Sequence, residues 1–402
     1  MEILDLNDLM YLQSVDLSAG ISRQSIQRYP EKNSYRETEQ IIFNLKNTKQ
    51  FLDMKNSSLK FEFTLTADGI VELQTGSILN IFRRVRVLTP SGEQISHVDH
   101  LNVLQSKLLQ VKHSQNFREV IGKSILRDKT TQGGLLVNNG AYVFTVPLRL
   151  LSPFFDNDTL IPPQLADGMR IEIDLERSKL IGAASTVGSF QVNNPFLMVD
   201  SYQMMPRVLT QTLEREELVY EYHDWQQAES SLSAGSNELA FPFNYSVSNA
   251  LEAFAVLRTV SSQTSATADS FQTVGITVDD PDDQLLWRWG SVQLPHTRLI
   301  GSAQLYQNVL YCYDQLCSKT CDNFDLQIEN ESDLETFTTT GAIYPVNLRR
   351  SRLFENSGRE ISNRNNLEAQ IRTHLSDSLV CDMFVHFVGR IVIKKDSMTV
   401  EK

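Results

Sequence analysis

The chain has 402 residues, of which 41% are hydrophobic and 21% charged, so it can bury large cores and is not a disordered polymer. Its 49 acidic residues outnumber 37 Lys and Arg, and the net charge of −12 opposes broad binding to nucleic acid or to an anionic membrane. Because single cores stop growing at roughly 250 to 300 residues, we expect two domains.

The N-terminal segment, "MEILDLNDLMYLQSVDLSAG", places Ile3, Leu6, Leu9 and Met10 at helical spacing. It lacks the charged start and long apolar core of a secretion signal, and no later stretch has the ~18 apolar residues of a membrane span. We therefore expect a protein that is neither exported nor membrane-spanning. The polar "ISRQSIQRYPEKNSY" that follows predicts an extended arm, so residues 1–35 are interpreted as an N-terminal arm outside any repeat.

Three stretches of the first half alternate apolar and polar residues with the period of two that is typical of a strand with one buried face. Their apolar positions are Leu59 to Leu65, Tyr142 to Leu150, and Met169 to Leu175. Between the first two, the spacing of Val98, Leu101, Leu104 and Leu108 predicts a helix.

The same series returns about 200 residues later. Leu251 to Leu257 repeats the first strand, a second helical stretch contains Asn308, Ala342 to Leu348 repeats the second strand, and Leu367 to Ile371 repeats the third. Polar loops of unequal length explain why the offset drifts. The recurrence predicts an arm at 1–35, a first domain at 36–210, a connection at 211–237 and a second domain at 238–402.

Short alternating strands, one helix per copy and long loops favour antiparallel sandwiches over parallel βαβ units. We therefore predict an all-β protein with two tandem eight-stranded antiparallel jelly rolls and short helices in the loops. The loop "SPFFDNDTLIPPQ" is stiffened by Pro153, Pro162 and Pro163. Phe154 and Phe155 should bury it on a barrel or a neighbouring subunit, or else within its own domain.

The sequence contains little evidence for a metal or catalytic site. Cys312, Cys317 and Cys321 lie near one side of a helix without the paired spacing of a zinc site, and with Cys381 they are too few for a disulfide framework. Buried or free thiols are the better interpretation.

His97 and His100 have no carboxylate and third histidine at metal-enzyme spacing, so structural or exposed histidines are expected. The acidic run Asp279, Asp280, Asp282 and Asp283 is interpreted as a solvated turn rather than a calcium loop. No nucleophile elbow, phosphate loop or dinucleotide motif is present. We predict no enzyme, with no catalytic, cofactor or metal residues and no cofactor.

Two segments resemble a known family. "VPLRLLSPFFDNDTLIPPQLADGMRIEIDLE" and "SILNIFRRVRVLTPSGEQISHVDHLNVL" are similar to stretches of the double jelly-roll major capsid proteins of polinton-like viruses and adintoviruses, which are related to virophage and adenovirus hexon-type capsid proteins. The resemblance covers roughly residues 40 to 395, and the chain is shorter than those relatives, so large outward towers are not expected.

The resemblance implies a major capsid protein of a double-stranded DNA virus, located in the virion and assembled inside the host cell. Its homotrimers would be pseudo-hexameric capsomers that tile an icosahedral shell. Partners would be neighbouring capsomers, penton and minor capsid proteins, and an inner membrane if one is present, with no direct contact to nucleic acid. The arm would lie inside the shell and contact one of these partners, or alternatively pack under its own barrel. A tandem jelly-roll carbohydrate-binding protein is the alternative function.

Overall fold

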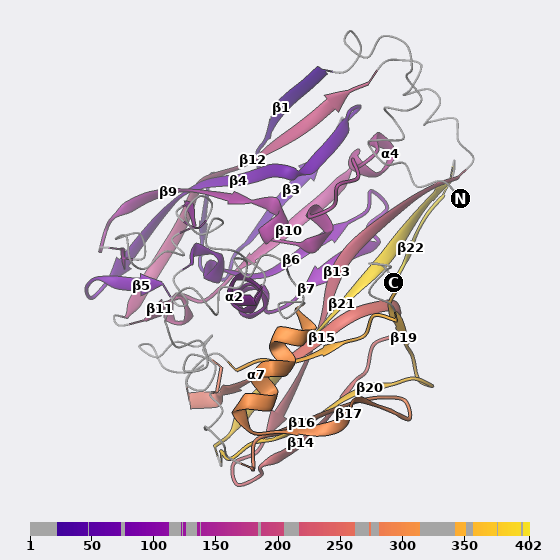
Figure 1. The fold of residues 1–402 in the computed structure, drawn as a ribbon. Coiled ribbons are helices and arrows are strands. Elements are labelled where there is room, and N and C mark those ends of the chain that lie inside the picture. Colours follow the sequence, from indigo (N-terminus) through magenta and orange to yellow (C-terminus); the bar gives the residue numbers. More distant parts are fainter. Residues whose placement is uncertain are drawn as a thin grey trace.

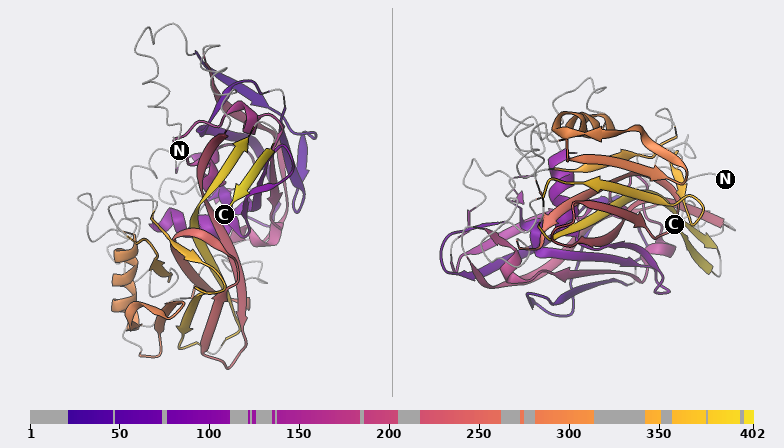
Figure 2. Two further views of the ribbon diagram at one scale, coloured as in Figure 1. Left: turned by 90° about the vertical axis from the view of Figure 1, so that its right-hand side faces the viewer. Right: turned by 90° about the horizontal axis from the view of Figure 1, so that it is seen from below.

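The structure is a computed structural model, and it describes residues 22–46, 48–73, 77–111, 122, 124–125, 135–136, 138–183, 186–204, 217–261, 273–274, 281–313, 342–350, 357–375, 377–394 and 397–402. Figures 1 and 2 show two β-sandwiches, the first coloured indigo to magenta and the second mainly orange to yellow. Among the described residues, no helix combines the length and apolar character that crossing a lipid bilayer requires.

The first half contains one five-stranded and one four-stranded antiparallel layer. One layer has the order β1 (Ser22–Arg28), β12 (Val187–Gln203), β4 (Phe51–Ala67) and β9 (Ala141–Pro147), with β2 (Ser34–Arg36) also paired to β12. The other has the order β3 (Gln40–Leu45), β10 (Met169–Leu175), β6 (Phe82–Leu88) and β7 (Gln94–Val98). A small sheet adds β11 (Gly182–Ala183), β5 (Val71–Leu73) and β8 (Leu135–Leu136).

The second half repeats this arrangement. One layer has the order β13 (Glu217–Leu232), β21 (Leu379–Lys394), β15 (Val247–Thr259) and β18 (Tyr344–Asn347), with β19 (Arg359–Ile361) on β15 and β22 (Ser397–Glu401) on β21. The other has the order β14 (Glu238–Phe243), β20 (Leu367–Arg372), β16 (Gln284–Trp289) and β17 (Val292–Ile300).

Helical segments lie in the connections. Helix α2 (Leu101–Val111) follows β7, and α7 (Gly301–Cys312) follows β17 at the same point of the second half. The short segments are η2 (Ile78–Ile81), η4 (Leu148–Leu150), η5 (Pro153–Phe155), α4 (Pro163–Ala166) and η6 (Ser178–Leu180).

The order of strands is the same in both halves, layer by layer, so the fold is a double jelly roll. The predicted repeat is present in this order: β4 corresponds to β15, β9 to β18, β10 to β20, and α2 to α7. In the first barrel the inward positions of β4 include Phe61, whose ring packs edge-on against Phe82 of the opposite layer at 5.8 Å. The alternation that the sequence displayed therefore marks the walls of each barrel.

Two boundaries differ from the prediction. The residues 22–35 were expected outside the repeat, but β1 pairs with β12 along Ser22 to Arg28 and occupies the place that β13 has in the second barrel. Residues 1–21 of the predicted arm lie outside the described residues. Strand β12 ends at Gln203 and β13 spans Glu217–Leu232. The predicted connection at 211–237 therefore contains a complete strand of the second barrel.

The error has a physical cause. Strand β1 is an edge strand with mostly exposed side chains, so its sequence lacks apolar alternation. Strand β13 has contacts on both faces, so Leu218 to Tyr220 form a continuous apolar run in place of an alternating one.

Candidate functional site

The loop that follows β9 in the first barrel packs against the second barrel. Ser152 accepts a hydrogen bond from the Phe154 N–H and thereby caps η5, while Pro153 starts this short helix. Phe154 and Phe155 are fully buried. The Phe154 ring contacts Tyr220 and Tyr222 of β13 at centroid distances of 5.9 and 5.5 Å. The aromatic loop therefore packs on the second barrel of its own chain.

Hydrogen bonds reinforce this aromatic contact. The Tyr222 hydroxyl donates to the carbonyl of Ile95 in β7 at 3.2 Å, and the Tyr220 hydroxyl donates to the carbonyl of Thr159 at 3.3 Å. Burial raises the pKa of both phenols, so both stay protonated donors at neutral pH. Gly389 on β21 is required here, because a Cβ at this position would lie 2.5 Å from the Tyr222 ring.

A buried carboxylate lies beside these tyrosines. Ser96 of β7 donates to Asp224 of β13 at 2.8 Å and also bonds Ser152 at 2.9 Å. Burial raises the pKa of Asp224 to about 6, because the hydrogen bonds from Ser96 and the backbone only partly offset the loss of water. The junction thus contains an acid that titrates close to neutrality.

A second polar cluster surrounds Asp382 of β21, which is fully buried. Arg258 of β15 donates from Nε and Nη2 to its Oδ2 at 2.8 and 2.6 Å. Gln227 of β13 donates to Oδ1 at 3.0 Å, and His100 Nδ1, from the first barrel, lies 2.7 Å from the same oxygen. Glu229 lies 3.6 Å from His100 Nδ1. The cluster holds the start of α2 against the second barrel.

The ion pairs determine the protonation of this cluster. Burial alone would lower the pKa of His100, but the hydrogen bond and the charge of Asp382 outweigh it and raise that pKa. Burial would raise the pKa of Asp382, but Arg258 and His100 outweigh it and lower the value to about 2. Both groups are therefore favoured in their charged forms.

Donor atoms of His100, Glu229 and Asp382 all lie within 4.8 Å of one another, a spacing that a metal ion could bridge. Both oxygens of Asp382 already accept hydrogen bonds, and Arg258 supplies the compensating positive charge. We therefore assign these residues as an ion-pair cluster between the barrels.

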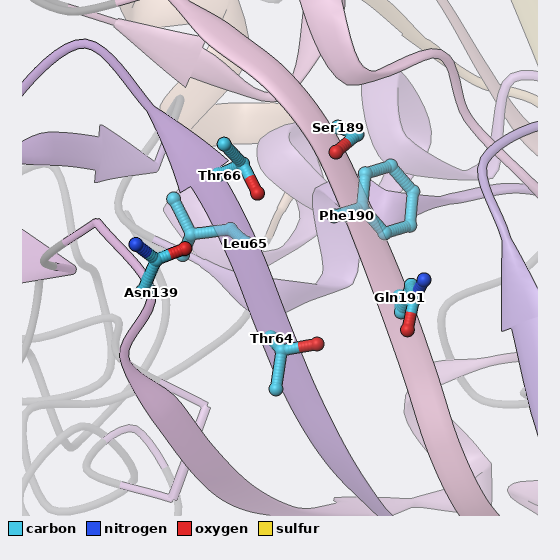
Figure 3. A pocket seen from close by; sticks show the side chains of 7 residues that line it. All are labelled: Thr64, Leu65, Thr66, Asn139, Ser189, Phe190 and Gln191. Atoms are coloured by element: carbon cyan, nitrogen blue, oxygen red, sulfur yellow. The ribbon is translucent and has the colours of Figure 1, made fainter.

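The outer face of the β4–β12 layer in the first barrel carries polar side chains. On β4 and β12, the outward residues Thr64, Thr66 and Gln191 are partly or fully exposed. With Leu65, Asn139, Ser189 and Phe190 they line a hollow of about 200 Å³ (Figure 3). The Phe190 ring is buried and not displayed, so the hollow lacks the aromatic platform expected of a carbohydrate site.

The remaining predicted positions have structural partners. His97 lies 2.9 Å from Asp99 within the first barrel. Cys312 and Cys381 are buried, and the Cys312 thiol lies 3.8 Å from Asn308 Oδ1, whereas Cys317 and Cys321 lie outside the described residues.

The acidic run was predicted to be a solvated turn, which agrees with the exposed Asp282 but is wrong for Asp283. Asp283 is fully buried rather than solvated, and it accepts from the backbone N–H of His374 at 3.0 Å, with the His374 ring 2.8 Å away. Asp282 pairs with Arg372 at 3.3 Å. Asp279 and Asp280 lie outside the described residues.

Sequence reasoning did not identify Asp224, Arg258 and Asp382. Local patterns could not pair His100 with Asp382, because 282 residues separate them. A usable signal was present in "LEAFAVLR" and "CDMFVHFV", where apolar residues occupy consecutive positions. Such runs indicate a strand buried on both faces, and a charged residue inside one requires a buried partner.

No family model and no curated protein sequence matches the chain. Solved structures do. The superposition on the PBCV-1 virus capsid has a TM-score of 0.66 at 10% identity, and it covers 98% of this chain and 99% of the capsid chain. The Faustovirus major capsid protein gives 0.66 at 8% identity, covering 97% and 94%, and the mavirus major capsid protein gives 0.54 at 12% identity, covering 97% and 92%. At these identities the likeness establishes the double jelly-roll fold.

Proposed function

We propose that this protein is the major capsid protein of a double-stranded DNA virus. The observation that carries the proposal is the match of both barrels over nearly the whole chain to capsid proteins of about the same length. The closed pair of barrels, with a joint made of buried aromatic rings and ion pairs, suits a rigid building block better than a catalyst.

The assembled form follows from the duplication. Three chains arranged by threefold symmetry present six barrels, and such a capsomer fills a quasi-sixfold position of an icosahedral shell with one gene product. Neighbouring capsomers, penton and minor capsid proteins are the partners in this proposal, and the protein is located in the virion after assembly in the host cell. The two segments that resemble polinton-like virus and adintovirus proteins support an origin in that group.

Purification followed by light scattering and negative-stain microscopy tests this function. We expect a trimer with a hexagonal outline and, on co-expression with minor capsid proteins, closed shells. A protein that stays monomeric at micromolar concentration and neutral pH would contradict the proposal.

The first 20 residues provide a second test. We propose that they act in assembly on the inner side of the shell, since the barrel begins with β1 at Ser22. Deleting residues 1–20 should leave a soluble trimer with a nearly unchanged melting temperature and reduce shell formation. Normal shells from the shortened chain would refute the assembly role, and loss of the trimer would show that the segment packs under its own barrel.

A further inference from the structure

Two histidines of the second barrel lie side by side on neighbouring strands. His223 is on β13 and His386 on β21, and Nδ1 of the first lies 3.2 Å from Nε2 of the second. The ring centroids are 5.1 Å apart. The ladder between the two strands is continuous from Glu217 to Leu232, so a regular sheet fixes the spacing of the two rings. Sequence spacing could not indicate this pair, because 163 residues separate the two histidines.

A carboxylate orients the His386 ring. Oε1 of Glu252, on the adjacent strand β15, lies 3.1 Å from His386 Nδ1, and both side chains are largely buried. A carboxylate can only accept hydrogen bonds, so His386 Nδ1 carries the proton and donates it. The neutral ring then has its lone pair on Nε2, which is the nitrogen that faces His223.

Packed aromatic rings fix the plane of the same imidazole. The Trp225 indole stacks on His386 at a centroid distance of 4.8 Å and an angle of 14°, and Phe254 packs edge-on against the indole at 5.3 Å. Trp225 and Phe254 are buried, so the imidazole cannot turn away from His223 without disrupting a close-packed region. A carboxylate on one ring nitrogen and an apolar surrounding are typical of a histidine that binds a metal through its other nitrogen.

We propose that His223 Nδ1 and His386 Nε2 bind a zinc ion or a similar divalent transition metal ion. With zinc–nitrogen bonds of about 2.0–2.1 Å, two nitrogens on one tetrahedral zinc lie about 3.3 Å apart, and the observed separation is 3.2 Å. The ion takes the place of the proton between the two nitrogens, and His223 adopts the tautomer with its proton on Nε2. Water completes the coordination, since His223 is partly exposed.

The charges around this pair differ from those of the Asp382 cluster. There, Arg258 pairs with Asp382 and opposes a further cation. Here, the nearest described charged partner of the histidines is the acidic Glu252. Arg390, four residues beyond His386 on the same face of β21, is paired with Glu221. A cation between the histidines therefore gains from Glu252 and meets a neutralised arginine.

The ion would tie β13 to the centre of its sheet. The opposite face of β13 carries Tyr222, which packs on Phe154 of the first barrel. A ligand that binds only the folded chain stabilises it, so zinc should raise the melting temperature. The site is separate from the capsid proposal, and the isolated chain suffices to test it.

Zinc binding to the purified chain, prepared without a histidine tag, tests the proposal. The chain is dialysed against zinc chloride in a chelator-free buffer, and bound zinc is measured by mass spectrometry. We expect zinc binding at least about tenfold weaker in His223→Gln than in the wild type. His296→Gln is the matched control, because it changes an exposed histidine of β17, and it should bind like the wild type. No zinc on the wild-type chain, or equal binding by His223→Gln, would overturn the proposal.

A second variant tests the positioning role of Glu252. Glu252→Gln should weaken zinc binding by roughly tenfold, because the amide orients the His386 ring less firmly and carries no charge. An unchanged zinc affinity in the folded variant would contradict this role.

Two further measurements separate this site from other zinc sites. If His100→Gln abolished binding while His223→Gln retained it, the ion would belong to the Asp382 cluster and the proposal would be wrong. X-ray absorption of the zinc-loaded wild type should show two imidazole ligands, and a spectrum without imidazole would also refute the proposal. This last measurement needs no variant, so it decides the question even if the substituted chains unfold.

Discussion

Individual side chains at the junction connect two segments of chain that are distant in sequence. Asp382 illustrates the energetics, since a fully buried carboxylate is costly unless every oxygen is paired. Arg258, Gln227 and His100 provide those partners, and only His100 comes from the first barrel. Removing His100 would leave Arg258 as the main compensation, so the cluster couples the ionisation of Asp382 to the packing of the two barrels.

Asp224 should make stability depend on pH. Its folded pKa of about 6 lies above the ordinary 3.8, so its contribution is fully present below pH 3.8 and is lost as the pH rises through about 6. The loss amounts to about 3 kcal/mol at most. Asp224→Asn should abolish this part of the decline in unfolding free energy between pH 4 and 7, measured by urea titration. Parallel curves for wild type and variant would disprove the assignment.

Phe154 should be a major contributor to the stability of the junction. Phe154→Ala removes a fully buried ring that contacts Tyr220 and Tyr222, and we expect a loss of about 3–5 kcal/mol in unfolding free energy. Val143→Ala, a truncation at a side chain that is 76% exposed, is the control and should change stability by less than about 0.5 kcal/mol. Equal effects of the two substitutions would contradict the proposed packing.

At the scale of elements, the two copies of each strand and helix share topology but differ in how many faces they bury. Strand β4 buries one face, with Lys60, Glu62 and Thr64 directed outward, whereas β15 places Glu252, Phe254 and Val256 at the corresponding positions. All three are buried. The second barrel therefore has an outer wall that is buried in the whole chain and that carries the apolar Phe254 and Val256 beside the charged Glu252.

The second barrel should consequently be insoluble by itself. Residues 217–402 expressed alone should aggregate or bind a hydrophobic dye, because Phe254 and Val256 lose their cover. Phe254→Glu with Val256→Thr, which copies Glu62 and Thr64 of the first barrel, should increase the soluble yield severalfold. A soluble, dye-negative second barrel without these changes would contradict this account.

At the scale of the whole molecule, the two barrels have a continuous set of buried contacts and form a single hydrophobic cluster among the described residues. Three sets of contacts make up the junction between the barrels. They are the aromatic packing on β13, the Ser96–Asp224 hydrogen bond and the Asp382 cluster. Relative motion of the barrels would expose each of them, so the pair should behave as one rigid unit.

Calorimetry should therefore show one unfolding transition for the whole chain. His100→Ala combined with Phe154→Ala should weaken the junction and separate the transition into two, since each barrel retains its own core. Two transitions in the wild-type protein would indicate that the junction contributes little to cooperativity. A single transition in the double variant would show that contacts elsewhere join the barrels.

The sequence by itself determined the all-β class and the duplication, because period-two alternation and its recurrence are local properties of strands with one buried face. It did not reveal β1 and β13 as barrel strands, since an exposed edge strand and a strand with contacts on both faces lack that alternation. Only the tertiary structure decided which polar residues meet. His100, Arg258 and Asp382 come from three distant segments, and their pairing depends on how one barrel packs on the other.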